Sequence, residues 1–189
     1  ILECAEAENF SFADVDSLGD IEEKDFTDQH IDAVLALPTV DVEAVRKAGF
    51  KVALDAVNSV GGIIMPRLLE RLGVECVCVN CEPTGEFAHN PEPLPSNLTE
   101  LCEAVVENGA DLGISVDPDV DRLALICEDG QPFGEEYTLV SVADYLFSRV
   151  CCQAREKGIT AEEAAAPYSL TSSSNLSSSR ALRDVTEQY

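Results

Sequence analysis

The middle of the chain alternates between apolar segments that suit strands and amphipathic segments that suit helices. Three apolar segments have the length and composition of buried strands: 50–54, 74–79 and 112–116. Helices are expected between them, at 63–72 and, capped by Ser96 or Asn97, up to residue 108. This order of strands and helices favours parallel pairing with right-handed crossovers. The sequence therefore predicts an α/β fold, namely a three-layer α/β/α domain with a mostly parallel sheet.

The segments around this core set the expected domain boundaries. Short helices at 28–37 and 41–47, the second capped by Asp41, suit a connector between domains. A fourth strand is expected at 123–127, followed by the hairpin signal Asp129-Gly130. We predict three parts: 1–38 as the tail of a preceding domain with its connector helix, 39–134 as the complete α/β/α domain, and 135–189 as an incomplete second α/β domain.

The last part of the chain has too few elements to close a sheet. A helix is expected from about 136 to 149, a strand at 168–172 and a final helix beginning near 178. The chain also starts with Ile1 rather than Met, which suits a piece of a longer polypeptide. These features predict the partial start of a second domain that resembles the first.

The composition limits the possible partners. Asp and Glu number 36 against 12 Lys and Arg, which gives a formal charge of −24, while 46% of the residues are hydrophobic. This large negative charge repels nucleic acid and anionic membranes, so neither is an expected partner. No apolar run approaches the ~18–20 residues of a membrane helix, and no signal segment is visible, so we expect a cytoplasmic protein.

The cysteines also suit a cytoplasmic protein. All eight are expected to be reduced thiols, most of them within apolar segments. Cys76, Cys78 and Cys81 lie close in sequence, but no second cysteine pair or nearby histidine completes a tetrahedral zinc site.

An acidic loop between the third and fourth strands carries the strongest chemical signal. Asp117, Asp119 and Asp121 occupy alternate positions, and Pro118 favours an extended conformation for the residue before it. Three adjacent carboxylates repel one another unless a cation lies among them, and all-oxygen ligands favour Mg²⁺, with Mn²⁺ or Ca²⁺ as alternatives. Arg122 places a permanently charged guanidinium beside them, which suits a phosphate.

Other interpretations of this loop remain open on the residues alone. It can be a solvated acidic turn in a non-catalytic interaction module, or the Asp-x-Asp of a haloacid-dehalogenase-like phosphatase, although that fold normally opens with the motif. A calcium-binding EF-hand is disfavoured, because Arg122 occupies the position of the required glycine and strands flank the loop.

Several motifs together resemble the α-D-phosphohexomutases, the family of phosphoglucomutase/phosphomannomutase and phosphoglucosamine mutase. They are Asp117-Pro118-Asp119-Val120-Asp121-Arg122, Asp55-Ala56-Val57-Asn58, Glu82-Pro83-Thr84-Gly85-Glu86-Phe87 with His89-Asn90-Pro91-Glu92-Pro93, and Gly134-Glu135-Glu136-Tyr137-Thr138. The resemblance runs from about residue 28 to the end. It implies the second domain of a four-domain mutase and the start of the third.

The resemblance also implies a mechanism. Asp117, Asp119 and Asp121 would bind Mg²⁺, and Arg122 would contact the phosphate in transfer between O6 and O1 of a hexose. The partners would be a phosphosugar and a phosphoserine loop in the missing first domain. No nucleophile is found in this chain, so it should be inactive alone, and its residues do not identify the hexose.

Overall fold

The computed structural model describes residues 2–8, 10–166, 173, 175 and 178–189. In chain order, the helices, 3₁₀ turns (η) and strands are α1 (Leu2–Glu6), η1 (Val15–Ser17), α2 (Thr27–Leu35), α3 (Val42–Ala48), β1 (Lys51–Asp55), α4 (Gly61–Arg71), β2 (Glu75–Val79), η2 (Pro95–Asn97), α5 (Thr99–Asn108), β3 (Leu112–Val116), β4 (Leu123–Cys127), α6 (Tyr137–Lys157), α7 (Ala161–Ala165) and α8 (Ala181–Gln188).

Four strands form one sheet in the order β2-β1-β3-β4. β1 pairs in parallel with both β2 and β3, whereas β3 and β4 pair antiparallel. The antiparallel pair follows from its short connection, because parallel strands need a crossover of a dozen or more residues. The predicted mostly parallel sheet is therefore confirmed.

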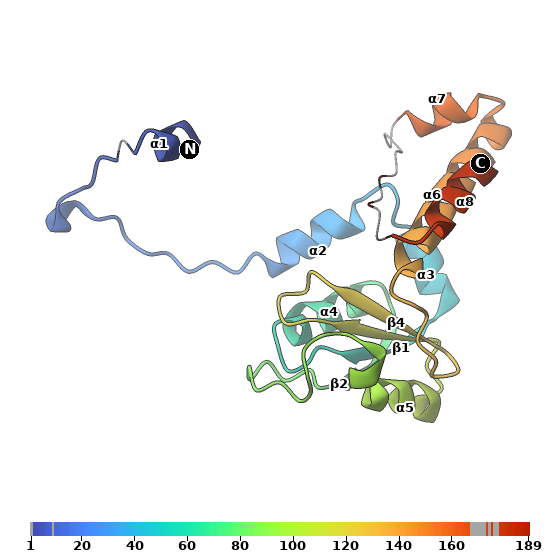
Figure 1. The fold of residues 1–189 in the computed structure, drawn as a ribbon, viewed down its shortest axis with the longest axis horizontal. Helices are drawn as coiled ribbons and strands as arrows, with labels where there is room; N and C mark the ends of the chain where they lie inside the picture. The colour runs from blue at the N-terminus through green and yellow to red at the C-terminus, as the bar shows by residue number, and fades with distance from the viewer. Residues whose placement is uncertain (1, 9, 167–172, 174, 176–177) are drawn as a thin grey trace.

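Helices cover both faces of this sheet (Figure 1). Val52 and Leu54 of β1 pack in a cluster with Leu69 of α4, while Ala53, between them, packs in another cluster with Leu101 of α5. A strand buried on both faces has apolar residues at nearly every position, as β1 does from Val52 to Leu54. The two clusters establish the three layers that the sequence predicted.

Of the two predicted helix caps, the one for α3 is correct and the one for α5 is wrong. Asp41 caps α3 by accepting a hydrogen bond from the backbone N–H of Ala44 at 3.0 Å. Neither Ser96 nor Asn97 caps α5, which begins at Thr99 without a side-chain cap. The amide of Asn97 instead donates to the backbone oxygen of Glu92 at 2.8 Å, so this side chain stabilises the preceding loop.

The C-terminal helices differ from the expectation in length. α6 continues past residue 149 to Lys157, because no helix-breaking residue occurs before Gly158, which ends it with a φ of 64°. The connection expected after it contains α7, which begins at a Thr160–Glu163 capping box. α8 begins at Ala181 rather than near 178, and the strand expected at 168–172 lies outside the described residues. The boundary at 134/135 stays a prediction.

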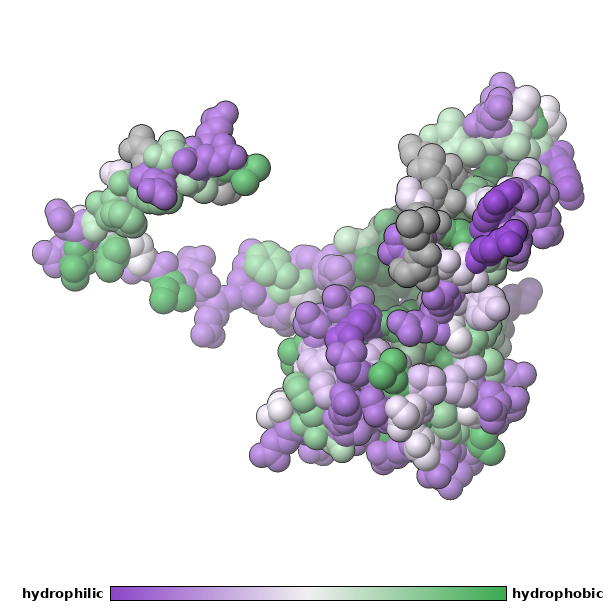
Figure 2. Space-filling model, viewed as in Figure 1, coloured by the Kyte–Doolittle hydropathy of each residue, from purple (hydrophilic) through white to green (hydrophobic). Residues whose placement is uncertain are grey.

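The N-terminal segment has little contact with the rest of the chain. Residues 10–26 are all exposed and extend away from the α/β domain (Figure 1). α2 is tied to α4 by two ion pairs of 2.6 Å, Arg67–Asp28 and Arg71–Asp32. On the face shown in Figure 2, hydrophilic residues are spread over the whole α/β domain, with apolar residues scattered among them. Among the described helices, none combines the length and apolar character needed to cross a membrane.

Candidate metal centre

The acidic loop leaves the sheet at the carboxyl end of β3. The expectation of an extended segment was wrong: the loop turns, and the N–H of Val120 donates to the backbone oxygen of Asp117 at 3.1 Å. Val120 has a φ of 62°, a left-handed conformation that is rare for a β-branched residue and costs about 1–3 kcal/mol. The tight turn, rather than strand alternation, brings the three carboxylates together.

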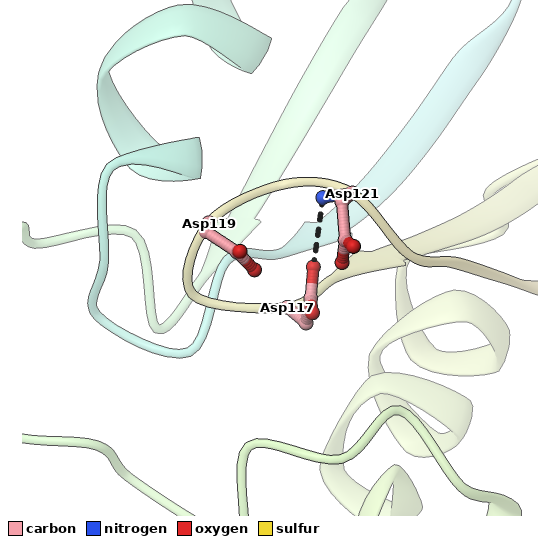
Figure 3. Close-up of side chains that lie close together, drawn as sticks. All are labelled: Asp117, Asp119 and Asp121. Carbon is pink, nitrogen blue, oxygen red and sulfur yellow. Dashed lines mark hydrogen bonds between the residues drawn. The ribbon is translucent and has the colours of Figure 1, made fainter. Parts of the chain in front are cut away.

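The three aspartates point toward one another inside the loop (Figure 3). One carboxylate oxygen each from Asp117, Asp119 and Asp121 lies within 4.8 Å of the others. Asp117 is buried, whereas Asp119 and Asp121 are exposed. The loop thus has one fixed carboxylate at its base and two on its solvent side.

Asp117 holds the loop together through three hydrogen bonds. Its Oδ1 accepts from the backbone N–H groups of Asp121 at 3.1 Å and Arg122 at 3.0 Å, and its Oδ2 accepts from Nε of Arg122 at 2.8 Å. Burial raises the pKa of Asp117, but the hydrogen bonds from Arg122 and Asp121 and the charge of Arg122 outweigh burial and hold this pKa below its ordinary value. Asp117 is therefore an anion at neutral pH.

Asp121 shows the opposite effect. Its contact with the Asp117 carboxylate, followed by the negative charges of Asp119 and Asp117, raises the pKa of Asp121 above its ordinary value. This mutual repulsion is the electrostatic cost that a cation between the carboxylates would relieve.

The start of α4 supports the loop from behind. The hydroxyl of Ser59 donates to the backbone oxygen of Pro118 at 2.8 Å. A Cβ on Gly61 would lie 2.6 Å from Val116 and 3.6 Å from Val120, so the absence of a side chain there allows the helix to approach the loop. The loop is thus packed against the domain rather than free in solvent.

Arg122 is held between two carboxylates from different segments. Besides its contact with Asp117, its guanidinium forms an ion pair with Glu92, and 47% of its side chain remains exposed. Glu92 belongs to the proline-rich loop of residues 82–97, which we call the 82–97 loop. The sequence motif included Glu92, but no sequence signal pointed to this pairing.

A second contact ties the same loop to β1. Nε2 of His89 lies 3.0 Å from Oδ2 of Asp55, which is fully buried at the end of β1. This contact gives His89 a structural hydrogen-bonding role. Family motifs marked the loop in the sequence, but no sequence signal placed His89 beside Asp55.

The contribution of Asp117 to stability should depend on pH. Because its pKa is lower in the folded chain, the charged form stabilises the fold above the unfolded pKa, about 3.9, and this stabilisation is lost as the pH falls through the folded value. We expect wild type to exceed Asp117→Asn in free energy of unfolding by about 1–2 kcal/mol at about pH 6. The difference should shrink between about pH 4 and pH 2. Urea unfolding at each pH measures it, with Asp119→Asn as control, and a difference that does not change with pH would contradict the assignment.

The residues of the loop fit a hard divalent cation. All three donors are carboxylate oxygens, which suit Mg²⁺, Mn²⁺ or Ca²⁺ rather than a thiophilic metal. Because the three oxygens lie within 4.8 Å of one another, all three would face a cation placed between them. Asp119 accepts no side-chain hydrogen bond from the described residues, which leaves both of its oxygens available.

Comparison with known proteins shows the class of protein to which this fold belongs. Residues 28–130 match the family model for the phosphoglucomutase/phosphomannomutase α/β/α domain II. The chain belongs to the phosphoglucomutase/phosphomannomutase family.

Individual relatives agree with this class. The chain is 37% identical over 139 residues to the phosphoglucomutase/phosphomannomutase of Thermococcus kodakarensis, covering 73% of this chain and 30% of that protein. It is 48% identical over 87 residues to a "Probable phosphoglucosamine mutase" of Methanosarcina barkeri, covering 46% of this chain and 20% of that one. The chain thus spans about three tenths of the first of these relatives and a fifth of the second.

Solved structures show the same fold. A phosphoglucomutase/phosphomannomutase family protein from Burkholderia thailandensis aligns with a TM-score of 0.55 and 30% identity, over 68% of this chain and 27% of that one. A structure from Thermus thermophilus aligns with a TM-score of 0.62 and 23% identity, over 69% of this chain and 30% of that one, and supports the fold alone.

Proposed function

We propose that this chain contains the Mg²⁺-binding domain of a phosphohexomutase that interconverts hexose 6-phosphate and hexose 1-phosphate. The observation that carries the proposal is the convergence of three carboxylates at the end of β3 beside Arg122, in a domain of the mutase family. Family membership favours this function over an acidic interaction module or a haloacid-dehalogenase-like phosphatase. The proposal includes cytoplasmic localisation.

Each residue of the loop has a proposed role. Asp117, Asp119 and Asp121 would bind Mg²⁺, which, when bound, stabilises negative charge on a transferring phosphoryl group. About half of the Arg122 side chain is exposed, and Asp117 and Glu92 fix its orientation. The guanidinium can therefore bind a phosphate oxygen with little loss of conformational entropy.

The remaining parts of the reaction would come from other domains. We propose that a phosphoserine loop in a preceding domain supplies the phosphoryl group and that a phosphosugar reorients as a bisphosphorylated intermediate. Residues 135–189 would then be the beginning of the third domain, and the chain alone should lack mutase activity. These assignments agree with the share of the relatives' length that the chain covers.

A Mn²⁺ titration of the 189-residue chain tests the metal site. We expect one site, competed by Mg²⁺, whose affinity falls at least about tenfold in Asp119→Asn, because one of three ligand carboxylates is lost. Asp20→Asn, an exposed aspartate in the N-terminal segment, is the matched control for the change in net charge. Equal Mn²⁺ affinities of wild type and Asp119→Asn, measured by electron paramagnetic resonance, would refute the ligand assignment.

A further inference from the structure

The 82–97 loop is fixed to the ends of two different strands. His89 joins it to Asp55 at the end of β1, and Glu92 joins it to Arg122, just beyond the acidic loop that follows β3. The two attachment points on the loop are three residues apart in sequence. A displacement of His89 would therefore move Glu92 and with it one of the two partners of the Arg122 guanidinium.

Both ring nitrogens of His89 have polar partners. Nε2 lies 3.0 Å from Oδ2 of Asp55, and Nδ1 lies 2.8 Å from the backbone oxygen of Asn90. The imidazole therefore bridges a fully buried carboxylate at the end of β1 and the backbone of its own loop.

The contact between His89 and Asp55 is buried. The Asp55 side chain is 0% exposed and that of His89 is 17% exposed, so an unpaired carboxylate there would be costly. Asp55 also accepts from the N–H of Val57 at 2.9 Å and from the amide of Asn80 at 3.4 Å. The same amide donates to Glu100 of α5 at 3.1 Å. Asp55 is thus held in place by several groups, and His89 is the partner that belongs to the 82–97 loop.

We infer that His89 is a positioning residue: its hydrogen bond with Asp55 fixes the 82–97 loop so that Glu92 holds the Arg122 guanidinium beside the acidic loop. The inference rests on the proposed function insofar as Arg122 is the phosphate-binding group. The coupling to Arg122 stands on the contacts of the chain itself.

A variant tests the coupling to Arg122. His89→Ala removes the hydrogen bond to Asp55, and we expect hydrogen exchange at Nη1 of Arg122, which donates to Glu92, to accelerate roughly tenfold, since a hydrogen bond to a charged group is weakened. His30→Ala is the matched control and should leave the exchange unchanged. Unchanged exchange in His89→Ala would exclude the positioning role.

The two proposals can fail separately. Mn²⁺ affinity should be the same in wild type and His89→Ala, because the three aspartates do not contact His89. Absence of a Mn²⁺ site in wild type would refute the proposed function and leave the exchange result intact, whereas unchanged exchange in His89→Ala would overturn the positioning role and leave the metal site intact.

Discussion

Replacing Asp117 with alanine should destabilise the domain by about 3 kcal/mol and abolish metal binding at the same time. The carboxylate accepts from two backbone N–H groups and from the guanidinium of Arg122, and its side chain is 0% exposed. Its removal leaves these donors without their acceptor and releases the turn that holds Val120 at a φ of 62°. Urea unfolding and a Mn²⁺ titration of the same variant measure the two effects.

Asp119→Ala is the control that separates the two effects. Asp119 is exposed and accepts no side-chain hydrogen bond in the described part of the chain, so its loss should change the free energy of unfolding by less than about 0.5 kcal/mol. It should still remove the metal site. If both variants were equally stable, Asp117 would not be the residue that holds the loop together.

Gly62→Ala should destabilise the chain by about 2–3 kcal/mol, through a clash that has no flexible side chain to relieve it. A Cβ at this position would lie 2.1 Å from the backbone oxygen and 2.7 Å from the carbonyl carbon of Cys81, just beyond the end of β2. Either α4 or the segment after β2 would have to move. Because the first turn of α4 also contacts the acidic loop, we expect Mn²⁺ affinity to fall as well.

Alanine variants of two other glycines serve as comparisons for the stability of Gly62→Ala. Gly19 has open space where a Cβ would be, so Gly19→Ala should be neutral within about 0.5 kcal/mol. Gly61→Ala meets side chains rather than backbone, with Val116 at 2.6 Å, and should have an intermediate effect. Thermal unfolding of the three variants ranks them, and a neutral Gly62→Ala would contradict the close packing of α4 against β2.

The strands were predictable because their apolar character is local. β3 and β4 have the predicted bounds, β2 begins one residue later than predicted, and β1 is shifted by one residue at both ends. Burial on both faces requires apolar residues at nearly every position, and this pattern can be read along the chain. The cap of α5 was not predictable in the same way, since Asn97 hydrogen-bonds to Glu92 within the loop instead of capping the helix.

The aspartates of the site were also visible in the sequence, but their geometry was not. Alternation suggested an extended segment, whereas a turn with a left-handed Val120 brings the carboxylates together. Val120 gives no sequence signal for a left-handed conformation, which is rare for a β-branched residue. The hydrogen bonds that Asp117 accepts offset the energetic cost of this conformation.

The sequence by itself determined the order of the four strands of the sheet and of the helices between them, the three carboxylates and the motifs shared with the mutase family. Only the tertiary structure decided which distant side chains meet: Glu92 with Arg122, 30 residues apart, and His89 with Asp55, 34 residues apart. The hydrophobic pattern along the sequence indicates whether a residue is buried, and this burial depends mainly on the helix or strand to which the residue belongs. A contact between a loop and two strand ends depends on how those elements pack, and no single segment of the chain contains that information.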